Sequence, residues 1–420
     1  MSNLNLKVAK LFIFSLVDLV VNKLGRYIGI LILINVVSRE TIGVLGIATG
    51  YLAFIGYLAI APEQILLRDY PKGKHGNLNQ EISAFGNFWA IRSVLTLLAG
   101  IVIFLVLRDE NLVLAVVFIG LLIQRLLEGF TNLIQLVFYV DFKQDTVAKI
   151  NFFNNSFLLV TFLLIFLYQS IYAYVAILTL GEFIFCVIWS IQLRKQFNFV
   201  YLFSSGWLSL VKKNLLEFTL WYHLSNATMN VVQNIGPVIL SFFASLAVVG
   251  EYTIALKIAG FFLIVSQIMQ KASFLHFANE MILPEKSTIK TLFAHIKIYG
   301  FLSLLAIIAF AFFGKLLIFS FLTKQNVDLL YQLVLIMLIG IFIFNVTRPL
   351  LAFASAKYSL RKGFIFVYIP SLVSSLVSYF LGTAYLGPFG LALAMIINYF
   401  TLFLLSLGFV SYATRKIPKN

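Results

Sequence analysis

The 420-residue sequence is too hydrophobic for a water-soluble protein, since 61% of its residues are hydrophobic and only 11% are charged. Soluble proteins carry about 25% charged residues, so this composition, with a mean hydropathy of +0.99, predicts an integral membrane protein. The net charge of +15 does not indicate a nucleic-acid partner, because most Lys and Arg residues lie between apolar runs, where they set topology and contact anionic lipids. The single cysteine, Cys186, excludes an internal disulfide framework.

Apolar runs long enough to cross a bilayer recur along the whole chain. A helical span needs about 20 apolar residues, and on that basis we predict an all-α integral membrane protein with twelve transmembrane helices. The predicted spans are residues 11–37, 41–62, 85–107, 111–138, 150–169, 171–193, 217–243, 247–270, 293–319, 328–350, 363–383 and 387–411.

The distribution of positive charge predicts the orientation of these spans. Of the 31 Lys and Arg residues, 22 lie in or beside the termini and the loops that follow even-numbered spans, whereas four lie in or beside the other loops. Cytoplasmic loops are enriched in Lys and Arg, so both termini are predicted to be cytoplasmic. An even number of spans requires the termini to share a side, which agrees.

The loops are short, and the two halves of the chain are faintly alike. Each of the longest loops has about 20 residues, too few for a soluble catalytic domain. The segment IGVLGIA (42–48) opens the second span and VGEYTIA (249–255) opens the eighth, which is typical of a duplicated transporter, although chance similarity between apolar segments is an alternative. We predict two six-helix bundles, residues 1–203 and 217–420, joined by an amphipathic cytoplasmic linker at 204–216.

The first span contains polar residues that a lipid-facing helix does not tolerate. Asp18, Asn22 and Arg26 fall within about 80° of arc on a helix, and Lys23 lies further round. One charge at the centre of a span costs roughly 2.5–3.5 kcal/mol on insertion scales, so these residues are predicted to face protein or water. Arg26 is the better candidate for an anionic ligand, and Asp18 for a charge partner or coupling cation.

Span 7 carries a similar polar stripe. His223, Asn226, Asn230, Gln233 and Asn234 fall within about 100° of arc, and Pro237 is predicted to bend the helix beyond them. Hydrogen bonding between helices is one explanation of the stripe, but five polar residues on one face favour the lining of a water-filled cavity.

Span 4 repeats the pattern with charged residues. Gln124, Arg125, Glu128, Asn132 and Gln135 fall within about 100° of arc, and Arg125 and Glu128 are spaced for an ion pair, which could be purely structural.

Isolated charges occur in four other spans. Arg92 and Lys257 are candidate ligands for an anion, or alternatively reach a membrane interface by extending along the helix. Glu182 lies in the middle of span 6 as either a buried neutral acid or a site for a coupling cation. Arg348 precedes Pro349 at the predicted end of span 10 and is interpreted as an ordinary interfacial arginine.

Enzymatic chemistry has little support in the sequence. Nucleophile-elbow, phosphate-loop and zinc-protease motifs are all missing, and the four histidines are scattered. We therefore expect no catalytic residues, no metal and no cofactor.

The layout of the chain resembles the polysaccharide repeat-unit flippases of the multidrug/oligosaccharidyl-lipid/polysaccharide exporter superfamily. Locally, the segments SRETIGVLGIATG (38–50) and APEQILLRDYPKG (61–73) resemble that family's entry to and exit from helix 2, and VGEYTIALKI (249–258) resembles the corresponding element of the second half. The resemblance implies two bundles around a central cavity that moves an undecaprenyl-pyrophosphate-linked oligosaccharide from the cytoplasmic to the outer leaflet of a bacterial cytoplasmic membrane.

The resemblance also implies roles for the polar residues. Substrate contacts are expected from Lys23, Arg26, Arg92, Gln124, Arg125, Asn132, Asn226, Asn230, Gln233 and Lys257. Asp18, Glu128 and Glu182 are expected as charge partners or as sites of coupling to a proton or sodium gradient. Expected partners are the lipid-linked substrate and membrane lipids, with a glycan polymerase and a chain-length regulator as candidates, and the protein is expected to be a monomer.

Two alternatives remain open at this point. A cation-coupled multidrug exporter of the same superfamily would favour acidic cavity residues, and five intramembrane cations against three acids weigh against it. A membrane-embedded glycan polymerase or transferase would gain from a large external loop, which the sequence lacks.

Overall fold

The computed structural model describes residues 27–60, 78–140, 144–195, 219–263, 270, 273, 277, 285–322 and 326–415. Within these residues the chain is helical and contains no strand. Contacts divide the chain into two compact units, which are described separately below. Unit 1 comprises the described residues of 1–37 and 54–223, and unit 2 those of 38–53 and 224–420.

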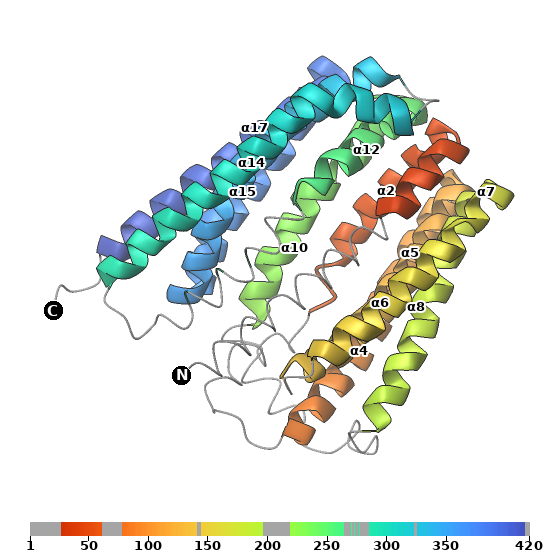
Figure 1. Ribbon diagram of the computed structural model, residues 1–420, viewed down its shortest axis with the longest axis horizontal. Coiled ribbons are helices and arrows are strands. Elements are labelled where there is room, and N and C mark those ends of the chain that lie inside the picture. Colours follow the sequence, from red (N-terminus) through yellow and green to blue (C-terminus); the bar gives the residue numbers. More distant parts are fainter. Residues whose placement is uncertain are drawn as a thin grey trace. The chain divides into compact units, whose positions relative to one another are not determined.

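Unit 1 is built from long apolar helices that run side by side (Figure 1). After an apolar helix at Tyr27–Val36 come α4 (Leu78–Glu110), α5 (Leu112–Val140), α6 (Gln144–Phe162), the short α7 (Leu164–Tyr168) and α8 (Ile171–Arg194). Helix α5 packs against both α4 and α8, so it forms the centre of the unit. Trp189 of α8 is fully buried against Phe138 of α5, with ring centroids 5.1 Å apart.

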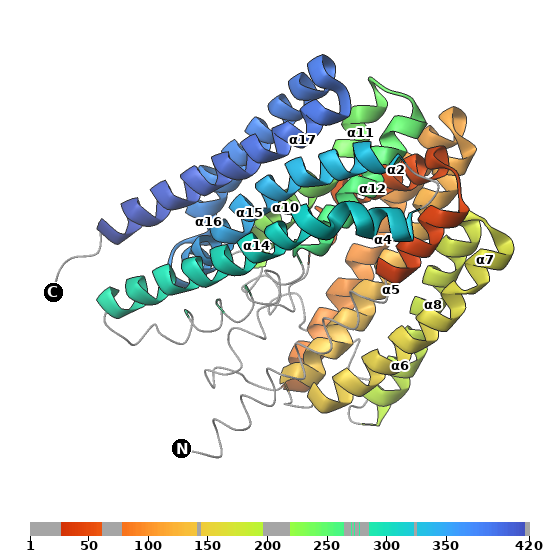
Figure 2. The ribbon, with the colours of Figure 1, turned by 45° about the horizontal axis from the view of Figure 1, so that its top comes forward.

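Unit 2 contains the remaining helices. They are α2 (Arg39–Ile55), α10 (Leu220–Asn234), α11 (Gly236–Ser241), α12 (Leu246–Phe261), α14 (Glu285–Phe321), α15 (Val327–Lys357), α16 (Leu360–Gly363), the π-helical segment η5 (Phe364–Tyr368) and α17 (Ile369–Arg415). Of α2 and α10, only residues 39–53 and the part from Leu224 onward, respectively, belong to this unit. Helices α14, α15 and α17 lie together in both views (Figure 1, Figure 2), and α15 packs against the other two.

Two predicted helix breaks are present. Helix α10 ends at Asn234, and Pro237 lies in the first turn of α11, where its missing N–H costs no helical hydrogen bond. Helix α17 reverses at Gly387, whose φ of 55° favours glycine, so the predicted spans 363–383 and 387–411 form a hairpin. The backbones of Gly382 and Gly390 meet near this turn, leaving no room for a Cβ atom.

The outer faces of these helices are apolar. Large side chains such as Val94, Val102 and Val106 of α4 are more than half exposed, which a membrane protein accommodates by contact with lipid. Seven helices among the described residues are long and apolar enough to cross a membrane, and one of them contains the α17 hairpin. The predicted all-α membrane architecture is therefore confirmed. The linker predicted at 204–216 lies outside the described residues.

Candidate functional site

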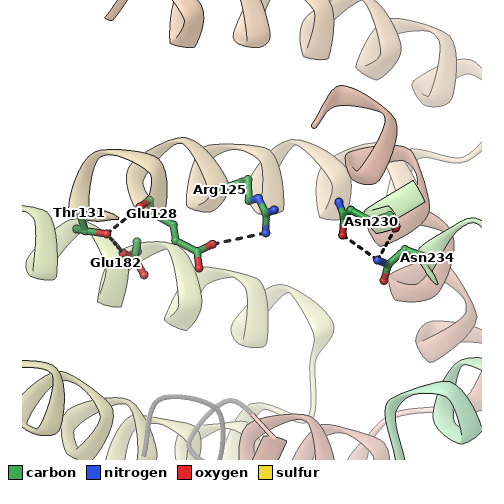
Figure 3. Close-up of polar contacts among 6 residues, drawn as sticks. All are labelled: Arg125, Glu128, Thr131, Glu182, Asn230 and Asn234. Atoms are coloured by element: carbon green, nitrogen blue, oxygen red, sulfur yellow. Dashed lines mark hydrogen bonds and ion pairs between the residues drawn. The ribbon is translucent and has the colours of Figure 1, made fainter. Parts of the chain in front are cut away.

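A buried carboxylate joins α5 and α8 inside unit 1. The side chain of Glu182 is 97% buried, since its relative exposure is 3%, and its Oε1 lies 2.8 Å from the hydroxyl oxygen of Thr131 (Figure 3). The same hydroxyl lies 3.0 Å from the backbone oxygen of Glu128. A hydroxyl has one proton and can donate it to only one of these oxygens.

The protonation state of Glu182 therefore decides how this contact is made. An ionised Glu182 only accepts, so the Thr131 hydroxyl must donate to it and leave the Glu128 carbonyl. A protonated Glu182 can donate to Thr131, whose own proton is then free to go to the carbonyl. Both forms are compatible with the observed distances.

The predicted ion pair on α5 is present one turn away. Arg125 Nη1 and Glu128 Oε2 are 3.8 Å apart, with side-chain exposures of 59% and 22% (Figure 3). Because the Arg125 side chain is exposed and the two charged atoms are far apart, the ion pair is weak and contributes at most about 1 kcal/mol to stability. Arg125 therefore retains most of its capacity to bind another anion.

The other residues of the α5 stripe have different surroundings. Gln124 is buried, whereas Asn132 is exposed. Gln135 donates a hydrogen bond of 3.2 Å to Asn151 of α6. The predicted stripe is thus partly structural, and only Arg125 and Asn132 are exposed on it.

Helix α10 has a polar face and a buried face, as its spacing predicted. Asn226 is exposed and Asn230, Gln233 and Asn234 are half-buried, while the residues between them are largely buried. Asn234 Nδ2 donates to the backbone oxygen and to Oδ1 of Asn230, at 2.9 and 3.0 Å (Figure 3). These two hydrogen bonds order Asn230 and Asn234, whereas Asn226 is exposed.

Two residues of unit 1 hold the segment that follows α2. Arg92 of α4 is only 7% exposed and donates to the backbone oxygen of Ile60. His223 Nε2 lies 3.0 Å from the backbone oxygen of Gly56. The contact with Ile60 therefore gives Arg92 at least a structural role. Lys257 is half-buried in α12.

Several predicted residues lie outside the described part of the chain. These are Asp18, Asn22, Lys23 and Arg26 of the first span. Their roles remain predictions. Among the described residues, no three His, Cys, Asp or Glu side chains are grouped so that they could hold a metal ion.

An ion pair in unit 2 escaped sequence analysis. Arg39, the first residue of α2, donates through Nη1 to Glu251 of α12, and Glu251 is only 8% exposed. Close to this pair, Gly43 of α2 packs directly on the backbone of α12, and Gly250 of α12 packs directly on the backbone of α2. The two segments whose sequences are alike, 42–48 and 249–255, thus contact each other. The available signal was a charged residue at each segment, Arg39 just before 42–48 and Glu251 within 249–255.

Arg348 was misassigned from the sequence. Helix α15 continues through Pro349 to Lys357, so Arg348 is not at a helix end, and it is only 5% exposed. Its Nη1 lies 2.5 Å from Gln270 Oε1, and its guanidinium carbon lies 4.5 Å from the Phe344 ring centroid. Its buried Nε has no hydrogen-bond partner among the residues that the structure describes. Arg348 is a buried cation with a neutral partner, which is an unusual and costly arrangement.

Comparison with solved structures identifies the fold. No protein-family model matches the sequence, and neither does any curated protein. A MATE transporter from Vibrio cholerae is similar with a TM-score of 0.65 and 13% identity over 98% of each chain. The lipid II flippase MurJ, in an inward closed conformation, has a TM-score of 0.70 and 14% identity over 95% of this chain and 87% of that one.

A third similar structure is a transporter of the MOP superfamily from Pyrococcus furiosus, with a TM-score of 0.60 and 14% identity over 98% of this chain and 96% of that one. Its description reports a reversed polarity of the binding pocket that suggests a different function for that protein. All three matches extend over nearly the whole of this chain. The protein therefore has the fold that these MATE, MOP and MurJ transporters share.

Proposed function

We propose that the protein is a flippase that moves undecaprenyl-pyrophosphate-linked oligosaccharide repeat units from the cytoplasmic to the outer leaflet of a bacterial cytoplasmic membrane. In this proposal the six-helix halves, residues 1–203 and 217–420, alternate in exposing a central cavity to the two sides. The product would feed the assembly of a surface polysaccharide. A glycan polymerase and a chain-length regulator are the candidate partners of a monomeric protein.

The observation that carries this proposal is the excess of cations inside the membrane-spanning region. The described parts of the spans contain the acids Glu128, Glu182, Glu251 and Asp328 and a larger set of basic residues, Arg92, Arg125, Lys257, Lys297, Lys315 and Arg348. Glu251 is paired with Arg39, and Asp328 with Lys315, so neither pair adds net charge. A pyrophosphate needs fixed cations that hydrogen-bond its oxygens, and Arg125 is a well-exposed candidate.

The polar face of α10 suits the sugar part of such a substrate. Asn226 is exposed, and an amide can both donate to and accept from sugar hydroxyls. Asn230 and Gln233 are half-buried on the same face and extend it by one to two turns. We assign phosphate binding to the arginines and sugar binding to these amides.

Glu182 is the candidate for coupling to an ion gradient. Its contact with Thr131 can be made in either protonation state, which is the property that a proton-coupling group requires. A sodium ion bound to the same carboxylate is the alternative form of coupling.

A cation-coupled multidrug exporter is the main competing function, because proteins described as MATE transporters share this fold. Cationic drugs call for acidic binding residues, however, and the described charges are basic in excess. For the Pyrococcus transporter, a reversed polarity of the binding pocket is reported to suggest a different function. This supports the use of the charge of the lining residues to distinguish the two functions.

The proposal is tested by translocation in proteoliposomes. A lipid-linked oligosaccharide is placed in the membrane, and its appearance at the opposite leaflet is followed by digestion with an externally added glycosidase. The wild-type protein is expected to accelerate translocation, and Arg26→Ala and Arg125→Ala to slow it about tenfold or more, the loss expected for one charge-assisted contact. Arg108→Ala, which removes an exposed arginine at the far end of α4, is the matched control. Full activity in both test variants would refute the assigned roles.

A further inference from the structure

Unit 1 contains an apolar groove that none of the functions discussed above uses. The groove has a volume of about 470 Å³ and lies among α4, α5 and α8. It is lined by Trp89, Leu127, Phe130, Phe183, Cys186, Val187, Ser190, Ile191 and Arg194. Seven of these nine residues are apolar, counting Cys186 and Trp89, and the two polar ones lie together toward the end of α8.

The floor and one wall of the groove are well packed. Cys186 Sγ lies 3.4 Å from the backbone oxygen of Leu127, so α8 and α5 meet at the floor. Trp89 and Phe130 form the wall, with ring centroids 4.7 Å apart. The concavity therefore comes from ordered packing.

The other wall is a stripe of side chains along α8 that is apolar at first and becomes polar and basic toward the end of the helix. Phe183, Val187 and Ile191 recur every four residues, and each is between 44% and 55% exposed. Ser190 and the exposed Arg194 continue the stripe to the end of the helix, where the exposed Lys195 caps it. The groove is thus apolar at its inner end and basic at its mouth.

The length of this stripe matches one leaflet of a bilayer. Phe183 and Arg194 are eleven positions apart, which corresponds to about 16 Å along a helix. Half of the roughly 30 Å hydrocarbon core is about 15 Å. With Arg194 at the level of the headgroups on the predicted cytoplasmic side, Phe183 lies near the bilayer centre.

We propose that this groove binds one anionic phospholipid of the cytoplasmic leaflet, with an acyl chain along α8 and the headgroup phosphate at Arg194 and Lys195. The apolar lining excludes a polar ligand from the inner part, and the cationic mouth selects an anionic headgroup over a zwitterionic one. A tightly held lipid would fix the spacing of α4 and α8. The proposal is independent of the transported substrate.

The test uses the fluorescence of Trp89 in the full-length protein. The protein is reconstituted in vesicles of phosphatidylcholine that contain increasing fractions of dibrominated phosphatidylglycerol, whose bromines quench tryptophan on contact. The difference between wild type and Trp89→Phe isolates the signal of Trp89 from that of the other three tryptophans. Half-maximal quenching is expected at a lower fraction of dibrominated phosphatidylglycerol than of dibrominated phosphatidylcholine.

Two variants probe the two ends of the site. Arg194→Gln is expected to weaken the apparent affinity for phosphatidylglycerol about fivefold, the contribution of one basic residue at an anionic membrane surface. Ser190→Phe is expected to fill the groove and remove the quenching of Trp89. Arg361→Gln, an exposed arginine of α16, and Val160→Phe, on the exposed face of α6, are the matched controls. Size-exclusion profiles establish that each variant is folded.

Three outcomes would overturn the proposal. Equal quenching by the two brominated lipids would mean that the groove meets lipid without selecting it. Unchanged quenching in Arg194→Gln and Ser190→Phe would place the lipid elsewhere. Displacement of the brominated lipid by undecaprenyl phosphate at a lower mole fraction than by plain phosphatidylglycerol would make a polyprenyl carrier the occupant.

Discussion

Arg39 and Glu251 form an ion pair across 212 residues of sequence, between the first residue of α2 and the first half of α12. The pair accompanies the close backbone contacts at Gly43 and Gly250, and together they attach residues 38–53 to unit 2. Helix α2 therefore belongs to unit 2 up to residue 53 and to unit 1 from Phe54 onward. Its first part contacts α12, whose segment 249–255 it resembles in sequence.

Breaking this ion pair should loosen α2 from α12. Glu251→Gln removes the negative charge from this pair, but Arg39 is more than a third exposed, so we expect a loss of only about 1 kcal/mol. The double exchange Arg39→Glu with Glu251→Arg should recover most of the loss, and a double-mutant cycle on the thermal unfolding of the purified protein measures the coupling. A cycle with zero coupling energy would show that the contact contributes nothing.

The glycines at the same contact should be intolerant of substitution. A Cβ on Gly250 would collide with the backbone oxygen of Arg39, which cannot rotate away, so Gly250→Ala is expected to destabilise the protein by more than about 1 kcal/mol. Among the described residues, nothing lies within 4 Å of a Cβ added to Gly408 of α17, so Gly408→Ala should be neutral or gain up to about 1 kcal/mol of helix propensity. Equal unfolding temperatures for the two variants would contradict the close approach of α2 and α12.

Glu182 should be needed for coupling and dispensable for folding. Glu182→Gln preserves the shape and an acceptor for the Thr131 hydroxyl, so its unfolding temperature should stay near the wild-type value. Translocation driven by a pH step across proteoliposomes should be lost in this variant and retained in Asp145→Asn, which changes an exposed acid of α6. If translocation by Glu182→Gln depends on the pH step as strongly as that by the wild-type protein, Glu182 has no part in coupling.

A negative charge placed beside the buried cation Arg348 should stabilise the protein. Gln270→Glu keeps the hydrogen-bond acceptor at 2.5 Å and supplies a negative charge, so it should raise stability by about 1–3 kcal/mol at neutral pH. Gln270→Ala removes the acceptor and should destabilise by a similar amount. The measurement is thermal unfolding in detergent, and a lower unfolding temperature for Gln270→Glu would show that Arg348 does not lack a counter-charge.

Features that depend on neighbouring residues in the chain were predictable. The apolar runs located the spans, the i,i+3 spacing located the Arg125–Glu128 pair, and Pro237 marked the break between α10 and α11. The polar face of α10 also followed from its spacing, because one helical period determines which residues share a face.

Features that depend on how helices pack were not predictable. The contact between Thr131 and Glu182 requires the register of α5 against α8, and the Arg39–Glu251 pair requires α2 to lie on α12. Arg348 was misread because a proline normally ends a helix, whereas α15 accommodates Pro349 within a span packed against α14 and α17.

The proposed substrate of this chain is an anionic lipid-linked oligosaccharide. The most direct measurement compares two substrates in one proteoliposome preparation, an undecaprenyl-pyrophosphate-linked oligosaccharide and a cationic dye such as ethidium. The net-basic set of intramembrane residues predicts translocation of the lipid-linked oligosaccharide, with strong loss in Arg125→Ala, and no transport of the dye. Dye export that is faster than in empty liposomes, with no movement of the oligosaccharide, would contradict the account and identify a cation exporter.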